Sequence, residues 1–321
     1  MSSLNTNNTA VNTGVTVTLS ALIVVDLIGN TLVILIILTN KSMKSPINYL
    51  LVNLAVADIM VGVFLAPRFI LNQFYIHPDG FAGKMMCSFL TGGNFSWVGA
   101  VASSFSLVTI CCERYEAVLH PFASNRNMSK KKSRAIVVLC WTIALVLNVP
   151  LFLTKIYKTN DKTCGSLWPK EHPWFEATYL ISWSVIVGII PIAIMLVLYS
   201  RVIYSLWFKQ HQVQGTQLAV LKSRKRVTKM VVIVSVVYAL FCLPDFIIHL
   251  LIFSGNTNSS FKSIHLSFII LMVCNSAINP FIYTLQSGKF RRHFKRIFCC
   301  TDTNKVFVDV NISLSAAAHN D

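Results

Sequence analysis

The sequence predicts an all-α membrane protein, a bundle of seven transmembrane helices followed by a short amphipathic eighth helix. Two observations lead to this fold class. Of the 321 residues, 54% are hydrophobic and only 12% are charged, which is about half the charge of an ordinary soluble domain. The apolar residues also gather in seven stretches, and most of them reach the ~20 residues that a helix needs to cross a bilayer.

Short polar segments separate the seven stretches, and the fifth and sixth are long enough to extend beyond the bilayer. We therefore divide the chain into an extracellular N-terminal tail (1–14), a transmembrane domain (15–286), an amphipathic membrane-surface helix (287–300) and a cytoplasmic tail (301–321). The predicted spans, in chain order, are 15–39, 47–71, 87–112, 135–154, 177–207, 227–253 and 264–286.

The basic residues indicate the orientation. The chain has 28 Lys and Arg against 12 Asp and Glu. Basic residues gather after the first, third, fifth and seventh spans, for example Lys130-Lys131-Lys132 after the third. The positive-inside rule places these loops in the cytoplasm, so the N-terminus lies outside and the C-terminus inside. The sequon at Asn7 is then free to receive a glycan. A nucleic-acid partner is not indicated, because nucleic-acid-binding proteins share the charge imbalance but not this hydropathy.

Two pairs of cysteines fall outside the spans. Cys87 lies at the outer mouth of the third span and Cys164 in the next outer loop, which is an oxidising environment, and we expect them to form a disulfide. Two free thiols are the alternative. Cys299 and Cys300 follow the basic amphipathic stretch at the inner surface, a setting that favours palmitoylation and contact with membrane lipid. The alternative there is an unmodified pair.

Each span carries at least one characteristic motif. The motifs are Gly29-Asn30, Asn53-Leu54-Ala55-Val56-Ala57-Asp58, Glu113-Arg114-Tyr115, Trp141, Pro191 with Tyr199, Pro244, and Asn279-Pro280-Phe281-Ile282-Tyr283 followed by Phe290. In this order the set resembles the rhodopsin-like family of G-protein-coupled receptors, over residues 15–300. The resemblance implies a plasma-membrane receptor that activates a heterotrimeric G protein, with arrestin as a further partner.

A polar cluster is predicted inside the membrane. Asp58 lies in the middle of the second span, where a carboxylate without a partner is costly. Asn275 and Asn279 are four residues apart and share a helix face, and Ser103 lies about three turns before Arg114. In similar receptors these positions hold a sodium ion that favours the resting state. The alternative is a water-filled polar cluster in which Asp58 is protonated.

At the inner end, the resemblance implies that Arg114 is the centre of G-protein coupling. Glu113 holds it at rest, beside Tyr115. An agonist outside favours an outward swing of the sixth span, and Arg114 then rearranges with Tyr199 and Tyr283. Phe122 resembles the loop residue that contacts the G protein.

The ligand is less well determined. The aspartate that binds amines in related receptors would fall at Ser96 when counted from Arg114, or at Asn94 when counted from Cys87, and neither residue is acidic. No lysine stands in the seventh span for a retinal, so an opsin is not indicated. Where the family usually has a tryptophan two residues before the proline, this chain has Cys242. Either Tyr238 or Phe241 then serves as the aromatic switch of the sixth span, or the helix moves differently.

We therefore predict a receptor for a peptide or other polar extracellular messenger. The acid Asp245 with His249 in the sixth span, and the base Arg68 in the second, would bind the two ends of such a ligand. The alternative is that they pair with each other or extend to water. The alternative functions are an aminergic-type receptor with Asp245 as counter-ion and a small-solute transporter. Neither a nucleophile–base pair nor a metal-ligand motif indicates an enzyme.

The resting state should also be weakly restrained. In many relatives an acid at the inner end of the sixth span holds the arginine equivalent to Arg114, but this chain has Arg224 there. Like charges repel, so this second restraint should be missing, and Glu113 acts alone or with Thr228.

Overall fold

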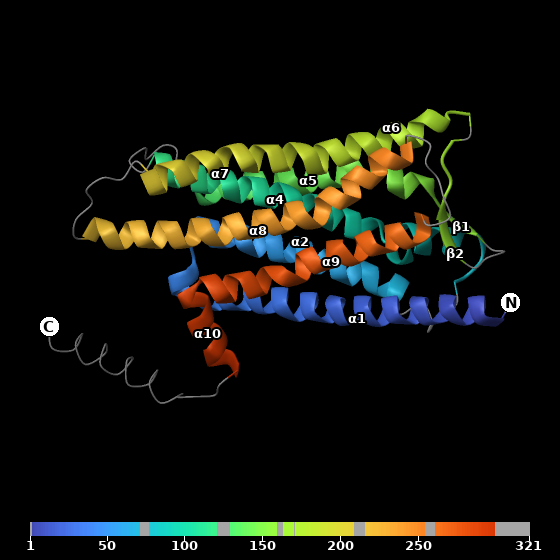
Figure 1. The fold of residues 1–321 in the computed structure, drawn as a ribbon, viewed down its shortest axis with the longest axis horizontal. Helices are drawn as coiled ribbons and strands as arrows, with labels where there is room; N and C mark the ends of the chain where they lie inside the picture. The colour runs from blue at the N-terminus through green and yellow to red at the C-terminus, as the bar shows by residue number, and fades with distance from the viewer. Residues whose placement is uncertain are drawn as a thin grey trace.

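The computed structural model describes residues 2–70, 77–120, 129–158, 163–169, 171–208, 216–253 and 261–298. Within these ranges seven helical segments are long and apolar enough to cross a membrane. They run alongside one another as one elongated bundle (Figure 1). The prediction of a seven-helix membrane protein is thus confirmed.

Five spans are single helices, whereas the third and fifth are each built from two α-helices joined by a π-helical turn. The single helices are α1 (Ser2–Thr39), α2 (Pro46–Phe69), α5 (Lys130–Thr154), α8 (Thr216–Phe253) and α9 (Phe261–Gln286). The third span consists of α3 (Gly80–Met86), η2 (Cys87–Thr91) and α4 (Asn94–Leu119). The fifth consists of α6 (Pro173–Ser184), η4 (Val185–Ile189) and α7 (Ile190–Phe208).

Two helix bounds differ from the sequence prediction. Helix α1 begins at Ser2, before the predicted start of the first span, and its part that is apolar enough to cross a membrane is Thr13–Thr39. The third span begins at Gly80 and ends at Leu119, beyond both predicted limits, because the helix continues through the charged residues Glu113 and Arg114. A 3-10 turn, η1 (Lys41–Met43), joins α1 to α2, and α10 (Gly288–Phe298) is the predicted amphipathic eighth helix.

A small β-hairpin, which the sequence did not predict, caps one end of the bundle. Strands β1 (Lys155–Lys158) and β2 (Thr163–Ser166) pair antiparallel, with Tyr157 opposite Cys164. We call this the disulfide end of the bundle. Helix α10 crosses the opposite end, which we call the α10 end (Figure 1).

Local sequence explains several helix boundaries. Pro46 occupies the first turn of α2, where its missing N–H costs nothing. The hydroxyl of Ser129 caps α5 by accepting from the Lys132 backbone N–H at 3.2 Å. Gly93, with φ of 75°, makes the joint between η2 and α4, a left-handed conformation that favours glycine.

The core is apolar and centred on α4. This helix packs against α2, α5 and α7, and α2 comes so close that a Cβ on Gly99 would lie 2.7 Å from the Ala57 carbonyl oxygen. Large apolar residues such as Leu196 and Val138 are instead exposed. In a membrane-spanning bundle this outer surface faces lipid.

Candidate functional site

A polar cluster lies where α2, α4 and α9 meet, around the fully buried carboxylate of Asp58. Ser103 Oγ donates to Asp58 Oδ1 at 3.0 Å, and Asn279 Nδ2 donates to Oδ2 at 2.8 Å. The structure thus brings together three residues that the sequence predicted as a cluster. Asn275 is buried one turn before Asn279, and within the described ranges neither amide oxygen has a hydrogen-bond partner. Unpartnered buried oxygens beside a carboxylate fit a small hard cation.

A second buried carboxylate, Asp26 in α1, belongs to the same region and was missed by the sequence analysis. Its Oδ1 accepts from Asn30 Nδ2 at 2.7 Å, and this amide also lies 3.2 Å from the Ser276 carbonyl oxygen of α9. Asp26 Oδ2 is buried and has no hydrogen-bond partner among the described residues. The available signal was an acid alone in an uncharged span, four residues before Asn30.

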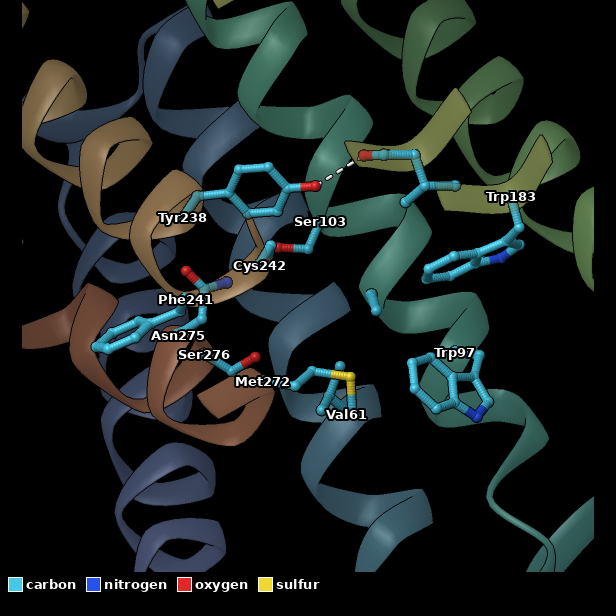
Figure 2. Close-up of a pocket in the computed structure, with 12 residues that line it drawn as sticks. Val61, Trp97, Ser103, Trp183, Tyr238, Phe241, Cys242, Met272, Asn275 and Ser276 are labelled. Atoms are coloured by element: carbon cyan, nitrogen blue, oxygen red, sulfur yellow. Dashed lines mark hydrogen bonds between the residues drawn. The ribbon is translucent and has the colours of Figure 1, made fainter. Parts of the chain in front are cut away.

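A cavity of about 40 Å³ opens beside the polar cluster, between five of the spans (Figure 2). Trp97 and Trp183 form one wall, with ring centroids 5.6 Å apart and nearly perpendicular planes. None of the lining side chains is charged. They are Val61, Trp97, Ala100, Ser103, Trp183, Val187, Tyr238, Phe241, Cys242, Met272, Asn275 and Ser276.

Asn94 and Ser96, two of the predicted ligand-pocket residues, are not among the described residues that line this cavity. Asn94 Nδ2 donates to the Ser88 and Leu151 carbonyl oxygens at 3.0 and 3.3 Å, and Ser96 Oγ donates to the Gly93 carbonyl oxygen. These bonds hold the start of α4 in place. The side chains of Arg68 in α2 and of Asp245 and His249 in α8 lie outside the part of the chain that the structure describes, so their role stays a prediction.

The structure also explains why the two counts along the third span disagree. Helix α4 is regular from Asn94 through Arg114, whereas Cys87 is followed by the π-helical η2 and the Gly92–Gly93 joint. A π-helical turn holds more residues than an α-helical one, and so η2 accommodates extra residues. Counting back from Arg114 therefore gives the correct register of α4, which is the count that reaches Ser96.

At the α10 end of α4, Arg114 and Glu113 form a bidentate ion pair. Arg114 Nε and Nη2 donate to the two carboxylate oxygens at 2.5 and 2.6 Å, and both side chains are 11% exposed. The fork-shaped geometry is the strong form of this interaction. Thr228 lies one turn after Arg224 in α8 and is buried. Its hydroxyl has no hydrogen-bond partner among the described residues, so it does not bond to Arg114 in this conformation.

The remaining predicted switch residues take different positions. Tyr199 and Tyr283 are buried in the core cluster at this end, and Ser235 Oγ donates to the Tyr199 hydroxyl at 3.4 Å. The ring centroids of Tyr115 and His120 are 6.2 Å apart. Phe122, Cys299 and Cys300 lie outside the described residues, as does the side chain of Asn7, and the proposals for them remain predictions.

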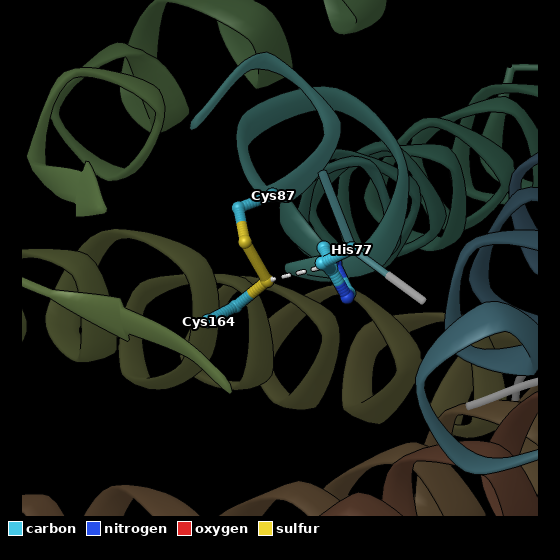
Figure 3. Close-up of side chains that lie close together, drawn as sticks. All are labelled: His77, Cys87 and Cys164. Carbon is cyan, nitrogen blue, oxygen red and sulfur yellow. Dashed lines mark hydrogen bonds between the residues drawn. A yellow bond between two sulfur atoms is a disulfide. The ribbon is translucent and has the colours of Figure 1, made fainter. Parts of the chain in front are cut away.

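The disulfide between Cys87 and Cys164 is confirmed. It ties η2 to strand β2 with a Cα–Cα distance of 5.6 Å and a sequence separation of 77 (Figure 3). His77 lies beside it, with Nε2 3.6 Å from Cys164 Sγ and 2.7 Å from Thr91 Oγ1. Desolvation lowers the pKa of His77, which favours its neutral form. Because both sulfurs are bonded to each other, they are not thiolates, and this group is not a metal site.

Comparison with known proteins agrees with this arrangement. The family described as "7 transmembrane receptor (rhodopsin family)" matches residues 29–283. The tachykinin-like peptides receptor 86C of Drosophila melanogaster is 32% identical over 85% of this chain and 56% of its own length. The substance-K receptor of Canis lupus familiaris is 29% identical over 92% of this chain and 79% of its own. The allatostatin-A receptor of Bombyx mori is 29% identical over 86% and 77%. The chain thus spans little more than half of the Drosophila receptor.

Proposed function

We propose, since the chain belongs to the rhodopsin family of seven-transmembrane receptors, that it is a cell-surface receptor for a peptide and activates a heterotrimeric G protein. The observation that carries the coupling is the bidentate pair of Glu113 and Arg114 at the end of α4. A cation whose ion-pair partner, among the described residues, is its own neighbour can exchange that partner when α8 moves outward. No covalent chemistry is needed, because an agonist shifts the equilibrium by its differential affinity for the two states.

The ligand class is inferred from the relatives. Receptors for tachykinin-like peptides, substance K and allatostatin A are among the similar proteins. Neither Asn94 nor Ser96 supplies the acid that an ammonium group would need. The amine-receptor and transporter alternatives are therefore not favoured. A peptide would enter from the disulfide end, where Asp245, His249 and Arg68 are the charged candidates for binding it.

The orientation follows from the basic loops. We place the disulfide end outside the cell and the α10 end in the cytoplasm, so that Asn7 is available for glycosylation and Cys299 and Cys300 for palmitoylation. The disulfide itself supports this placement, because such bonds persist in oxidising compartments. Phe122 and α10 then lie on the side where the G protein, arrestin and the inner lipid surface meet the receptor.

The polar cluster is proposed as an allosteric sodium site. Asp58 and Ser103 supply oxygen atoms, and Asn275 and Asn279 supply the unpartnered amide oxygens nearby. A bound cation would offset the cost of the buried carboxylate. Because the site is built from α2, α4 and α9, an ion there favours the conformation in which these helices are closest.

The test is a screen of cells that express the chain against a peptide library, read by G-protein biosensors. We expect at least one peptide to give a response that Arg114→Gln abolishes at matched surface expression and unchanged peptide binding. Arg134→Gln is the matched control, because Arg134 is an exposed arginine of α5, and it should keep the response. A full response from Arg114→Gln would contradict the proposed coupling.

A further inference from the structure

Three side chains of the kinds that bind zinc gather at the disulfide end: the imidazole of His77 and the sulfurs of Cys87 and Cys164 (Figure 3). Their nitrogen and sulfur atoms all lie within 4.8 Å of one another. They come from three separate segments, because His77 precedes α3, Cys87 begins η2 and Cys164 lies in β2. While the sulfurs are bonded to each other they bind no metal, but reduction of this bond leaves two thiols beside an imidazole.

The distance from the imidazole to one sulfur already matches a zinc site. Zinc binds a histidine nitrogen at about 2.0–2.1 Å and a cysteine sulfur at about 2.3 Å in tetrahedral geometry, so the two ligand atoms are about 3.5 Å apart. His77 Nε2 lies 3.6 Å from Cys164 Sγ. The sulfurs must separate from a covalent distance of about 2 Å to about 3.8 Å. Two unbonded sulfur atoms repel at covalent distance, so reduction itself drives most of this movement.

Neighbouring groups hold the imidazole in this place. The ring of His77 stacks on that of Tyr157 in β1, with centroids 5.1 Å apart and planes 18° apart. Thr91 Oγ1 lies 2.7 Å from His77 Nε2 and 3.2 Å from Cys164 Sγ. Its hydroxyl would therefore stand beside a bound metal, where it can donate to a thiolate or to a water ligand. His77 and Cys164 are partly exposed, so an ion can reach them from solvent.

The donor set determines which metal fits. Thiolate and imidazole ligands favour zinc, whereas sodium, magnesium and calcium prefer carboxylate and carbonyl oxygens. Two cysteines and one histidine leave a fourth tetrahedral position, which a water molecule fills. This donor set therefore differs in kind from the oxygen cluster around Asp58, and the two places in the chain would bind different cations.

We propose that Cys87, Cys164 and His77 form a zinc site that becomes available when an external dithiol reduces the disulfide. The dithiol gives up two electrons and two protons and becomes a disulfide itself, and the two cysteines become thiols. Zn²⁺ then displaces one proton from each thiol and binds both sulfurs and His77 Nε2. The metal joins η2 to β2 in place of the covalent bond, so the hairpin keeps its position in the reduced receptor.

The test uses purified full-length receptor, reduced with a phosphine that is then removed without oxygen, and titrated with Zn²⁺ against a chromophoric chelator. Reduced receptor should bind one more zinc ion than oxidised receptor. The oxidised form is an internal control for the other thiols, such as those of Cys111 and Cys112, which are free in both forms. Zn²⁺ at about 100 times its dissociation constant should raise the apparent Tm of the reduced receptor by about 3–8 °C and leave that of the oxidised receptor unchanged.

The variant His77→Gln tests the imidazole. It keeps both cysteines, and glutamine can still hydrogen-bond to Thr91, so the oxidised variant should fold as before. We expect the zinc affinity of its reduced form to fall at least about tenfold, because loss of even an outer-shell partner costs about 10–100-fold. His172→Gln is the matched control. His172 is an exposed histidine directly before α6 at the same end of the bundle, and its variant should bind zinc as the unmodified receptor does.

Three results would overturn the zinc site: equal zinc binding by the reduced and oxidised receptor, unchanged affinity in reduced His77→Gln, or unfolding of the reduced receptor to the same extent with and without Zn²⁺ present during reduction. None of these measurements depends on a peptide or a G protein. A receptor that gains one zinc ion on reduction but answers no peptide supports the metal site while the proposed signalling function fails, so the two proposals are distinguished.

Discussion

Replacing Asp26 with leucine should stabilise the receptor. The carboxylate of Asp26 is fully buried, accepts one side-chain hydrogen bond from Asn30, and has a second oxygen without a partner among the described residues. The amide of Asn30 would not be orphaned by the change, since it also lies 3.1 Å from the Asp26 backbone carbonyl and 3.2 Å from that of Ser276. Leucine branches at the same atom as aspartate, and Gly62 leaves the facing backbone free of a side chain.

The expected change in stability is the difference between a gain from removing a buried polar group and a cost from steric crowding. Replacing a buried ion pair with apolar residues of similar volume is often stabilising by about 1–4 kcal/mol, and a buried carboxyl group with one oxygen unpartnered among the described residues carries a desolvation cost of similar size. Crowding by the leucine methyl group against α2 offsets part of this gain, because Asp26 Oδ2 already lies 2.5 Å from where a Cβ on Gly62 would be. We expect a net gain of about 1–3 kcal/mol, or a rise of about 2–8 °C in apparent Tm.

The assay is thermal unfolding of purified receptor at a fixed heating rate, since membrane-protein unfolding is commonly irreversible. Asn148→Leu is the control, because Asn148 is equally buried with an unpartnered oxygen but carries no charge, and it should gain less or lose stability. A fall in apparent Tm for Asp26→Leu would refute the reasoning, since it would mean that a bound cation or a proton compensates this carboxylate.

Three further predictions concern the other charged groups. Replacing sodium with N-methyl-glucamine at equal ionic strength should lower the apparent Tm of the unmodified receptor but not of Asp58→Asn, and an equal fall in both would argue against the sodium site. Basal second-messenger signalling should be raised by Glu113→Gln and reduced by Arg224→Glu, by up to about tenfold for ~1.4 kcal/mol, and signalling unmoved by either at matched expression would contradict Glu113 as the restraint. The pKa of His77 is lowered from 6.5 by desolvation, so the folded state binds this proton less readily than the unfolded chain. The stability contributed by neutral His77 is therefore present above about pH 6.5 and is lost as the pH falls below it. When the pH is lowered from about 7.5 to about 5.5, the apparent Tm of the unmodified receptor should fall further than that of His77→Gln.

The sequence predicted two kinds of feature: side chains whose position follows from residue spacing along one regular helix, and a disulfide whose formation follows from its position outside the cell. Asp58, Ser103 and Asn279 meet as expected, because each lies on a long regular helix whose phase can be counted from a motif. The Cys87–Cys164 bond was expected from the two positions at the outer mouth. Asn94 and Ser96 could not be placed in this way, because the π-helical η2 and the Gly92–Gly93 joint break the count between Cys87 and Arg114.

Other parts depend on contacts between segments that no spacing reveals. The β1–β2 hairpin is formed by residues with no long alternating pattern, and one strand is fixed by the disulfide. Asp26 was overlooked because one acid hardly changes the hydropathy of a 25-residue span. Pro191 has no N–H, so the sequence indicates that the Val187 carbonyl lacks its usual donor in the helix. That the hydroxyls of Ser104 and Tyr238 lie within hydrogen-bond distance of it depends on how α4 and α8 are rotated.

The contacts that hold α8 against the neighbouring helices do not include the Glu113–Arg114 ion pair. Arg114 is paired with its own neighbour in α4, and α8 carries no acid between Thr216 and Pro244, so no ionic bond from this stretch can hold Arg114. Near the α10 end, Lys225 Nζ of α8 instead lies 5.2 Å from the ring centroid of Trp207 in α7. Such a cation–π contact at an exposed site contributes about 0.5–1 kcal/mol. The hydrogen bond from the Tyr238 hydroxyl of α8 to the Val187 carbonyl oxygen of η4, at 2.7 Å, is buried and therefore shielded from water. Among these contacts, the one in the interior of the bundle is therefore expected to hold α8 more firmly than the one at its exposed end.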